Sequence, residues 1–259
     1  MTEPLRVDRR DAVTVLTLNV PERRNAMTAE LTAAWVAAVD ALRADTVTRA
    51  VVVTGEGSAF CAGGDLSWIG ESPDLTVMAV RERMLPFYRQ WLSVRDLPVP
   101  VIAAVNGPAV GAGLCLALAC DIRYAARDAV FSAPFARLGM HPGMAATYLL
   151  PEVVGLARAR ELLLTGRRVG ADEAERLGLV SAVSDDVLAT ALEAAEGIAA
   201  SAPIAVRLTK AALAHAPHQS LDAALDWEGL AQPLTLTSAD LREGLAAQAE
   251  RRTPRFTGS

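Results

Sequence analysis

Residues 106–121 read NGPAVGAGLCLALACD, and their pattern predicts a turn that joins a buried strand to a buried helix. Glycines stand at positions 107, 111 and 113, and an unbroken apolar run from Leu114 to Cys120 follows them. The first backbone N–H groups of a helix have no intrahelical partner and carry partial positive charge. Small residues at this point either allow a tight turn and close helix packing, or let a ligand approach those amides.

A second glycine-rich turn comes earlier in the chain, at residues 58–66, with the sequence SAFCAGGDL. Val51–Thr54 precedes this turn and Val101–Val105 precedes residues 106–121, and both short apolar runs are typical of buried strands. If one backbone amide from each turn pointed at the same spot, the two N–H groups would form an oxyanion hole. The glycines are also compatible with tight turns alone, and neither turn has a phosphate-loop or dinucleotide-binding pattern.

The rest of the chain alternates strands and helices before it becomes almost wholly helical. Val13–Leu18 predicts a strand, Asn19–Asn25 predicts a turn, and Thr28 can cap a helix that runs to about Leu42. The remaining expected strands cover 121–125, 129–132 and 180–183, and the remaining expected helices cover 76–94, 156–164, 171–177, 186–200, 203–214, 220–231 and 238–251. This order predicts an α/β core at residues 1–200 and a C-terminal helical subdomain at 201–259.

Composition excludes several classes of protein. The 259 residues carry a net charge of −5 without a dense Lys/Arg run, which argues against nucleic-acid binding. The N-terminus has no apolar signal core and no window reaches 18 uncharged apolar residues, so we expect no membrane partner and a cytoplasmic protein. Cys61, Cys115 and Cys120 have neither disulfide nor metal spacing, and we expect reduced, packed thiols and no metal site.

Short motifs recur along the whole chain in an order and spacing that are specific together. They are Pro21–Ala26, Phe60–Leu66, Ala104–Gly107, Gly111–Gly113, Cys120–Ile122, Leu138–Gly139 with Pro142–Gly143, Leu164–Gly166, Gly178–Val180 and Asp240–Gly244. With them the chain resembles the crotonase superfamily, also called the enoyl-CoA hydratase/isomerase family. The resemblance implies a spiral of ββα units and a C-terminal helical region that mediates homotrimers, often paired into homohexamers. It implies no cofactor beyond the coenzyme A of the substrate.

The resemblance also implies an acyl-CoA site. Two backbone N–H groups hold the thioester oxygen and stabilise an enolate, and by motif match these donors fall on Ala62 and Ala112. The residues expected along the substrate and its CoA moiety are Arg24, Ala26, Ala62, Gly63, Gly64, Asp65, Leu66, Val110, Gly111, Ala112, Cys115, Phe135 and Arg251.

The chain departs from the family's hydratases at the two positions that carry catalytic glutamates. These positions hold Cys115 and Phe135, and neither side chain does the acid–base work of a carboxylate. General acid–base catalysis contributes about 10²–10⁴ per group, and one oxyanion donor about 10²–10³. Ordinary hydration is therefore not expected, even with an intact oxyanion hole.

Other side chains could move a proton. His141 lies on the loop that brings acid–base groups into the pocket in some branches of the family, and its unperturbed pKa suits proton transfer near neutrality. It could equally cap or hydrogen-bond that loop. Cys115 could act as a nucleophile only beside a base, and its apolar neighbours favour inert packing. Arg137 and Tyr148 are further loop candidates for which a structural role is favoured.

Three functions remain open at this point. The first is an enzyme that acts on an acyl-CoA by enolate stabilisation, in an isomerisation, decarboxylation or thioester cleavage. The second is a non-catalytic acyl-CoA binder or carrier that keeps the pocket without the acid–base groups. The third is a scaffold subunit without ligand binding, against which the intact turn at residues 62–66 argues.

Overall fold

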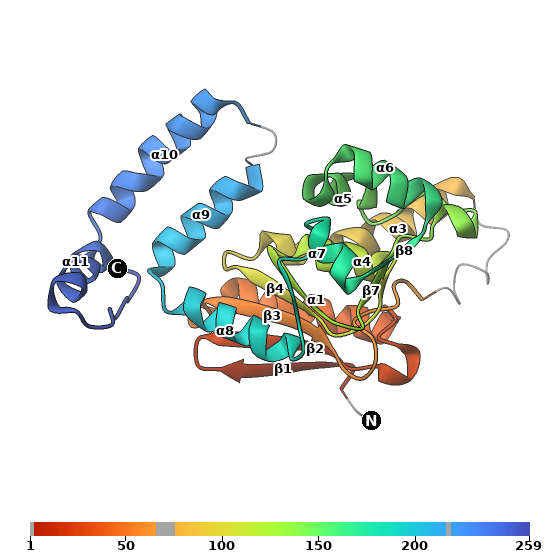
Figure 1. The fold of residues 1–259 in the computed structure, drawn as a ribbon, viewed down its shortest axis with the longest axis horizontal. Coiled ribbons are helices and arrows are strands. Elements are labelled where there is room, and N and C mark those ends of the chain that lie inside the picture. Colours follow the sequence, from red (N-terminus) through yellow and green to blue (C-terminus); the bar gives the residue numbers. More distant parts are fainter. Residues whose placement is uncertain (1–2, 66–75, 216–218) are drawn as a thin grey trace.

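The computed structural model describes residues 3–65, 76–215 and 219–259, and Figure 1 shows its arrangement. The strands are β1 (Leu5–Arg10), β2 (Val13–Leu18), β3 (Ala50–Gly55), β4 (Val101–Val105), β5 (Ala109–Val110), β6 (Ile122–Ala126), β7 (Val130–Ser132), β8 (Arg168–Gly170) and β9 (Ala182–Ser184). The helices are α1 (Ala29–Ala44), α3 (Val77–Leu92), α4 (Ala112–Ala119), α5 (Ala146–Val154), α6 (Leu156–Thr165), α7 (Ala171–Arg176), α8 (Val187–Ala199), α9 (Pro203–His215), α10 (Leu221–Leu236) and α11 (Ala239–Glu250). Short 3₁₀ turns cover Pro21–Arg23, Ser93–Asp96 and Ala136–Leu138.

The main sheet has the strand order β1-β2-β3-β4-β6-β9. Only β1 runs antiparallel to its neighbour, and the other pairs are parallel. The carboxyl ends of β3 and β4 therefore lie side by side at one edge of the sheet. The segments that follow Gly55 and Val105 start at this edge, which is where open parallel sheets place their ligands.

Alternation along the central strands divides the core into two layers. In β2, Leu16 and Leu18 belong to the larger apolar cluster, whereas Val13 and Val15 belong to a smaller cluster with α8. Side chains in a strand point alternately to opposite faces, so one run of apolar residues can bury both faces of the sheet. Figure 1 shows α8 lying along the strands of this sheet.

Helices α1 and α3 are held together by a pair of stacked indole rings. Thr28 caps α1 by accepting a hydrogen bond from the Leu31 amide at 3.2 Å. Trp35 of α1 stacks on Trp91 of α3 with ring centroids 5.0 Å apart, and both side chains are fully buried. Large aromatic side chains bury extensive apolar area, so this contact fixes the position of α3 over the core.

A small second sheet, β5-β7-β8, lies beside the start of α4. β5 pairs with β7 in parallel, and the Gly111 amide donates to the Ser132 carbonyl at 2.8 Å. These bonds tie the turn before α4 to β7 and to the loop after it.

The helices after residue 200 extend to one side of the sheet (Figure 1). The predicted boundary between residues 200 and 201 falls between the end of α8 and the start of α9. Lys210 of α9 contacts the core through an ion pair with Asp121, at 2.8 Å between Nζ and Oδ2. Within the described ranges, no single helix is long and apolar enough to cross a membrane, although the bent pair α8 and α9 passes on length and composition alone.

Candidate functional site

The two glycine-rich turns are hydrogen-bonded to each other at the edge of the main sheet. The Cys61 amide donates to the Pro108 carbonyl at 3.1 Å, and the Val110 amide donates to the Cys61 carbonyl at 3.0 Å. Cys61 and Ala109 thereby form a parallel bridge. The structure thus brings together the two turns that the sequence places about fifty residues apart.

The close approach of the turns explains two of their glycines. A Cβ atom on Gly113 would lie only 2.2 Å from the Cys61 carbonyl oxygen. A Cβ atom on Gly63 would lie 2.6 Å from the Val110 carbonyl oxygen, and Gly63 also has a φ of +96°. Any side chain at either position would push the two backbones apart, so glycine is required for the turns to meet.

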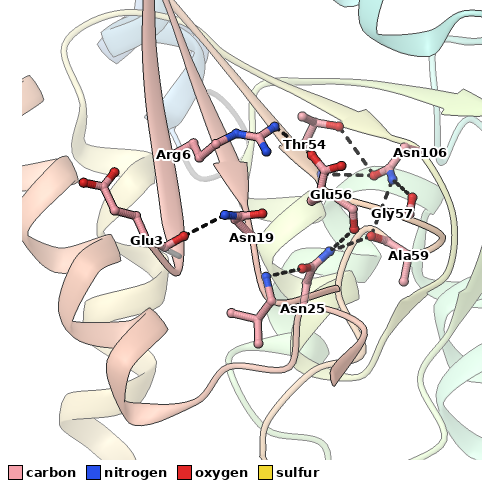
Figure 2. A network of polar contacts seen from close by, with 11 residues as sticks. Glu3, Arg6, Asn19, Asn25, Thr54, Glu56, Gly57, Ala59 and Asn106 are labelled. Carbon is pink, nitrogen blue, oxygen red and sulfur yellow. Dashed lines mark hydrogen bonds and ion pairs between the residues drawn. The ribbon is translucent and has the colours of Figure 1, made fainter. Parts of the chain in front are cut away.

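Two asparagine side chains shape the loop that leads from β3 into the first turn (Figure 2). Asn25 is fully buried, and its side-chain amide donates to the carbonyls of Glu56 and Ala59 at 3.0 and 2.8 Å. The Asn106 side chain accepts from the Gly55 amide and donates to the Gly57 carbonyl, each at 3.0 Å. Loop carbonyls that would otherwise lack partners are satisfied in this way.

The backbone amides of the two turns differ in whether they have an acceptor. The Ala62 amide donates to the Arg24 carbonyl at 2.9 Å, so this predicted donor is already engaged. The Gly64 amide, two residues later, has no acceptor among the described residues. The Ala112 amide, at the first position of α4, also has no acceptor in the described part of the chain. Gly64 and Ala112 thus offer one amide from each turn that has no acceptor in the described residues.

Several of the residues expected along the CoA moiety lie at or beside the turn at residues 58–66. Leu66 and Arg251 are the two exceptions. Arg24 is exposed beside it with a φ of +51°, and Asp65 forms an ion pair with Arg23 at 2.8 Å. Leu66 lies outside the described residues. Arg251 follows α11, which lies well apart from α4 (Figure 1), so within one chain it does not join this cluster.

Cys115 and Phe135 are two uncharged residues near the start of α4. Cys115 is fully buried and burial raises the pKa of its thiol to about 12, so it is a neutral thiol rather than a thiolate. Its Sγ lies 3.7 Å from the Gly143 carbonyl oxygen. The Phe135 ring approaches to within 3.7 Å of where a Cβ on Gly111 would be. Neither residue supplies a charge to the site.

His141 does not point to a catalytic partner. Its side chain is exposed, and its Nδ1 lies 2.8 Å from the carbonyl oxygen of the adjacent Pro142. His141 therefore contacts the backbone of its own loop, which is the second of the two roles considered for it from the sequence. In residues 3–65, 76–215 and 219–259 no group of three His, Cys, Asp or Glu side chains is arranged to hold a metal ion.

Sequence reasoning missed three side chains of this region. Asn25 and Asn106 stood inside the recognised motifs without a role, although an asparagine next to a tight turn is a common backbone partner. Tyr88 of α3 was missed entirely. Its hydroxyl lies where a side chain at Gly143 would project, and nothing in the spacing of α3 indicates this contact.

Comparisons with known proteins show the family to which the chain is similar. Residues 8–259 match the sequence family described as "Enoyl-CoA hydratase/isomerase". A Mycobacterium tuberculosis protein named "Probable enoyl-CoA hydratase EchA14" is 45% identical over 225 residues, covering 86% of each chain. The 1,2-epoxyphenylacetyl-CoA isomerase of Escherichia coli is 41% identical over 253 residues, covering 95% of each chain.

The fold is that of solved structures of the same kind. The crystal structure of an enoyl-CoA hydratase from Bacillus anthracis superposes with a TM-score of 0.93 at 37% identity, covering 99% of this chain and all of that one. The mixed α/β core with its mostly parallel sheet is a crotonase fold, as the sequence predicted. The chain therefore belongs to the enoyl-CoA hydratase/isomerase family.

Proposed function

We propose that this protein binds an acyl-CoA thioester with its carbonyl oxygen between the backbone amides of Gly64 and Ala112, and stabilises the enolate of the acyl group. One observation carries the proposal: both amides lack an acceptor in the described residues, and their turns are bridged through Cys61 and Ala109. Gly64 replaces Ala62 as the first donor, because the Ala62 amide is bonded to the Arg24 carbonyl.

The physical basis is electrostatic preorganisation. An enolate oxygen carries more negative charge than a thioester carbonyl, so fixed N–H donors bind the enolate more strongly than the ground state. Ala112 begins α4, where the helix dipole adds partial positive charge. The close contacts of Gly63 and Gly113 keep the donors in place without reorganisation.

The reaction is not ordinary hydration in this proposal. Cys115 and Phe135 occupy the positions of the hydratase glutamates, and the thiol is neutral. Isomerisation, decarboxylation and thioester cleavage need fewer carboxylates. The name of the Escherichia coli relative, a 1,2-epoxyphenylacetyl-CoA isomerase at 41% identity, supports an isomerase-type reaction. The competing proposal is a non-catalytic acyl-CoA carrier, which the uncharged residues Cys115 and Phe135 also favour.

A proline substitution tests the donor pair. Proline is tolerated at the first helical position but has no N–H, so Ala112→Pro removes the donor while α4 can still form. Calorimetry should show butyryl-CoA binding to the unaltered protein and weaker binding to Ala112→Pro. Ala29→Pro, the same change at the first position of α1, is the matched control and should bind normally.

The same samples distinguish an enzyme from a carrier. Enolate stabilisation should accelerate exchange of the α-hydrogens of butyryl-CoA in D₂O, with a base of the buffer accepting the proton and D₂O returning a deuteron. NMR follows the exchange, and Ala112→Pro should slow it. Binding without exchange or turnover would favour the carrier. Failure of the unaltered protein to bind any saturated acyl-CoA from acetyl- to octanoyl-CoA would contradict both proposals.

A homotrimer, or a homohexamer of paired trimers, completes the proposal. Large apolar side chains are exposed on α9, α10 and α11, and they include Leu213, Leu221, Leu225, Leu230, Leu234 and Leu245. Large exposed apolar side chains gathered on neighbouring helices are typical of a protein interface when they form one surface.

A further inference from the structure

The hydroxyl of Tyr88 occupies the space above Gly143. Tyr88 lies on α3, one helical turn before the buried Trp91, and a Cβ atom on Gly143 would lie only 2.4 Å from its hydroxyl oxygen. The Gly143 carbonyl oxygen also accepts a hydrogen bond from the Cys115 thiol, with 3.7 Å between the oxygen and Sγ. Tyr88 and Cys115 therefore meet at the same glycine, from two different helices.

The hydrogen bonds of this hydroxyl leave its proton available. The Met144 amide hydrogen-bonds to the hydroxyl oxygen. No hydrogen bond from the Tyr88 O–H to an acceptor is found among the described residues. Burial and the neighbouring Cys115 raise the pKa of Tyr88, so the phenol stays protonated near neutrality. The Tyr88 hydroxyl can therefore still donate one hydrogen bond.

The backbone around Gly143 is held in an unusual conformation that supports this contact. Met144 and Ala145 have φ values of +50° and +57°, in the left-handed region that side-chain-bearing residues rarely adopt. Each such residue costs about 1–2 kcal/mol, so surrounding structure must compensate. The Met144 side chain is buried, and on the other side the stacked Trp35–Trp91 pair fixes α3. The donor is therefore preorganised rather than free to turn away.

The neighbours of the hydroxyl indicate what it serves. Cys115 follows Ala112 by three residues on α4, so the two residues lie on the same side of the helix, about 4.5 Å apart along its axis. An acyl chain whose thioester oxygen meets the Ala112 amide can reach Tyr88 with a group a few bonds further on. The buried Cys115 thiol and the Phe135 ring keep this region uncharged, and Tyr88 adds a hydrogen-bond donor to it.

We propose that Tyr88 is a specificity-determining residue that donates a hydrogen bond to an oxygen substituent on the acyl chain, so that the protein prefers hydroxyacyl- or oxoacyl-CoA to an unsubstituted acyl-CoA. This inference rests on the proposed function, since it requires that an acyl-CoA occupy the site. Its chemistry is recognition only, with no bond made or broken.

Calorimetry with three probes tests the inference on the full chain: butyryl-CoA, 3-hydroxybutyryl-CoA and 4-hydroxybutyryl-CoA. The unaltered protein should bind at least one hydroxylated probe about two- to tenfold more tightly than butyryl-CoA, the range expected for one neutral hydrogen bond. Tyr88→Phe should weaken the hydroxylated probes selectively and so remove this preference. Tyr148→Phe, at the exposed tyrosine of α5, is the matched control and should keep the preference.

Each outcome has a separate meaning. The inference is overturned if neither hydroxylated probe is preferred by the unaltered protein, or if the preference survives in Tyr88→Phe. It is also overturned if Tyr88→Phe weakens all three probes equally, because that result describes a wall of the pocket and not a donor. Failure of every probe to bind the unaltered protein would instead contradict the proposed function itself. A thermal melt confirms that Tyr88→Phe is folded before the titrations are compared.

Discussion

The side-chain amide groups of Asn25 and Asn106 both donate to the carbonyl oxygen of Ala59, at 2.8 and 3.5 Å (Figure 2). Ala59 lies two residues before Cys61, whose backbone bridges the two turns. One oxygen thus links a turn near the N-terminus, the loop after β3 and the segment after β4. The position of the proposed donor at Gly64 depends on this link.

Removal of the Asn25 side chain should destabilise the fold strongly. Asn25→Ala leaves the Val20 amide and the Glu56 carbonyl without their partner, removes the shorter of the two bonds to the Ala59 carbonyl, and places alanine at a φ of +55°. Unsatisfied buried groups cost about 1–3 kcal/mol each, so we expect a loss of about 3–5 kcal/mol in the free energy of unfolding. Urea denaturation measures it. Asn19→Ala, which loses one exposed bond to the Glu3 carbonyl, should cost less than about 1 kcal/mol; equal losses would contradict the argument.

A methyl group at Gly113 should separate the two turns. In Gly113→Ala the new Cβ would meet the Cys61 carbonyl at 2.2 Å, so we expect about 1–3 kcal/mol of destabilisation and loss of butyryl-CoA binding. The matched control is Gly197→Ala on the exposed side of α8, where a Cβ has nothing within 4 Å. That variant should be more stable by about 0.5–1 kcal/mol and bind normally. Normal binding by Gly113→Ala would show that the contact between the turns is not needed.

The buried thiols should make the protein less stable at alkaline pH. Burial raises the pKa of Cys115 from 9.0 to about 12, so between these values the unfolded thiol is ionised and the folded one is not. The unfolded state then binds fewer protons, and the free energy of unfolding falls by about 1.4 kcal/mol per pH unit for this thiol. Urea midpoints from pH 8 to 10.5 should decline less steeply for Cys115→Ala. Identical slopes would mean that the thiol is accessible in the fold.

Crotonyl-CoA should be a poor substrate for hydration. Cys115 and Phe135 remove two acid–base groups, each of which contributes about 10²–10⁴ to the rate. We expect the enoyl absorbance to decay at least about a hundredfold more slowly than with an ordinary enzyme of about 1–10³ turnovers per second. Turnover within that range would show that another group delivers the water.

A charge on the exposed face of α10 should disrupt the proposed trimer. Leu230 is 73% exposed in the single chain, and Leu230→Glu would place a carboxylate in an apolar interface. Sedimentation equilibrium should show dissociation to smaller species. Leu164→Glu on α6, where the leucine is 76% exposed, is the matched control and should leave the assembly intact. A monomeric unaltered protein would contradict the proposal directly.

The sequence predicted the strands and helices that have a clear apolar pattern within their own residues. The strands at residues 13–18 and 101–105 are confirmed, and Thr28 caps α1 as its spacing before the apolar stripe indicates. β1 was not predicted, because an edge strand with mostly exposed side chains has no apolar run. α5 was not predicted either, since Pro151 and the glycine-rich loop before it conceal the helical pattern.

The residue pattern alone was enough to indicate the family, the uncharged side chains at positions 115 and 135, and the two glycine-rich turns. Which amides lack an acceptor could be seen only in the folded chain, because the Ala62 amide bonds to the carbonyl of Arg24, 38 positions earlier in the sequence. The folded chain also places the Tyr88 hydroxyl of α3 against Gly143. These two residues are far apart in the sequence, and no local pattern indicates that they meet. Local pattern encodes periodicity and turn chemistry, whereas the pairing of donors with acceptors is set by packing between distant segments.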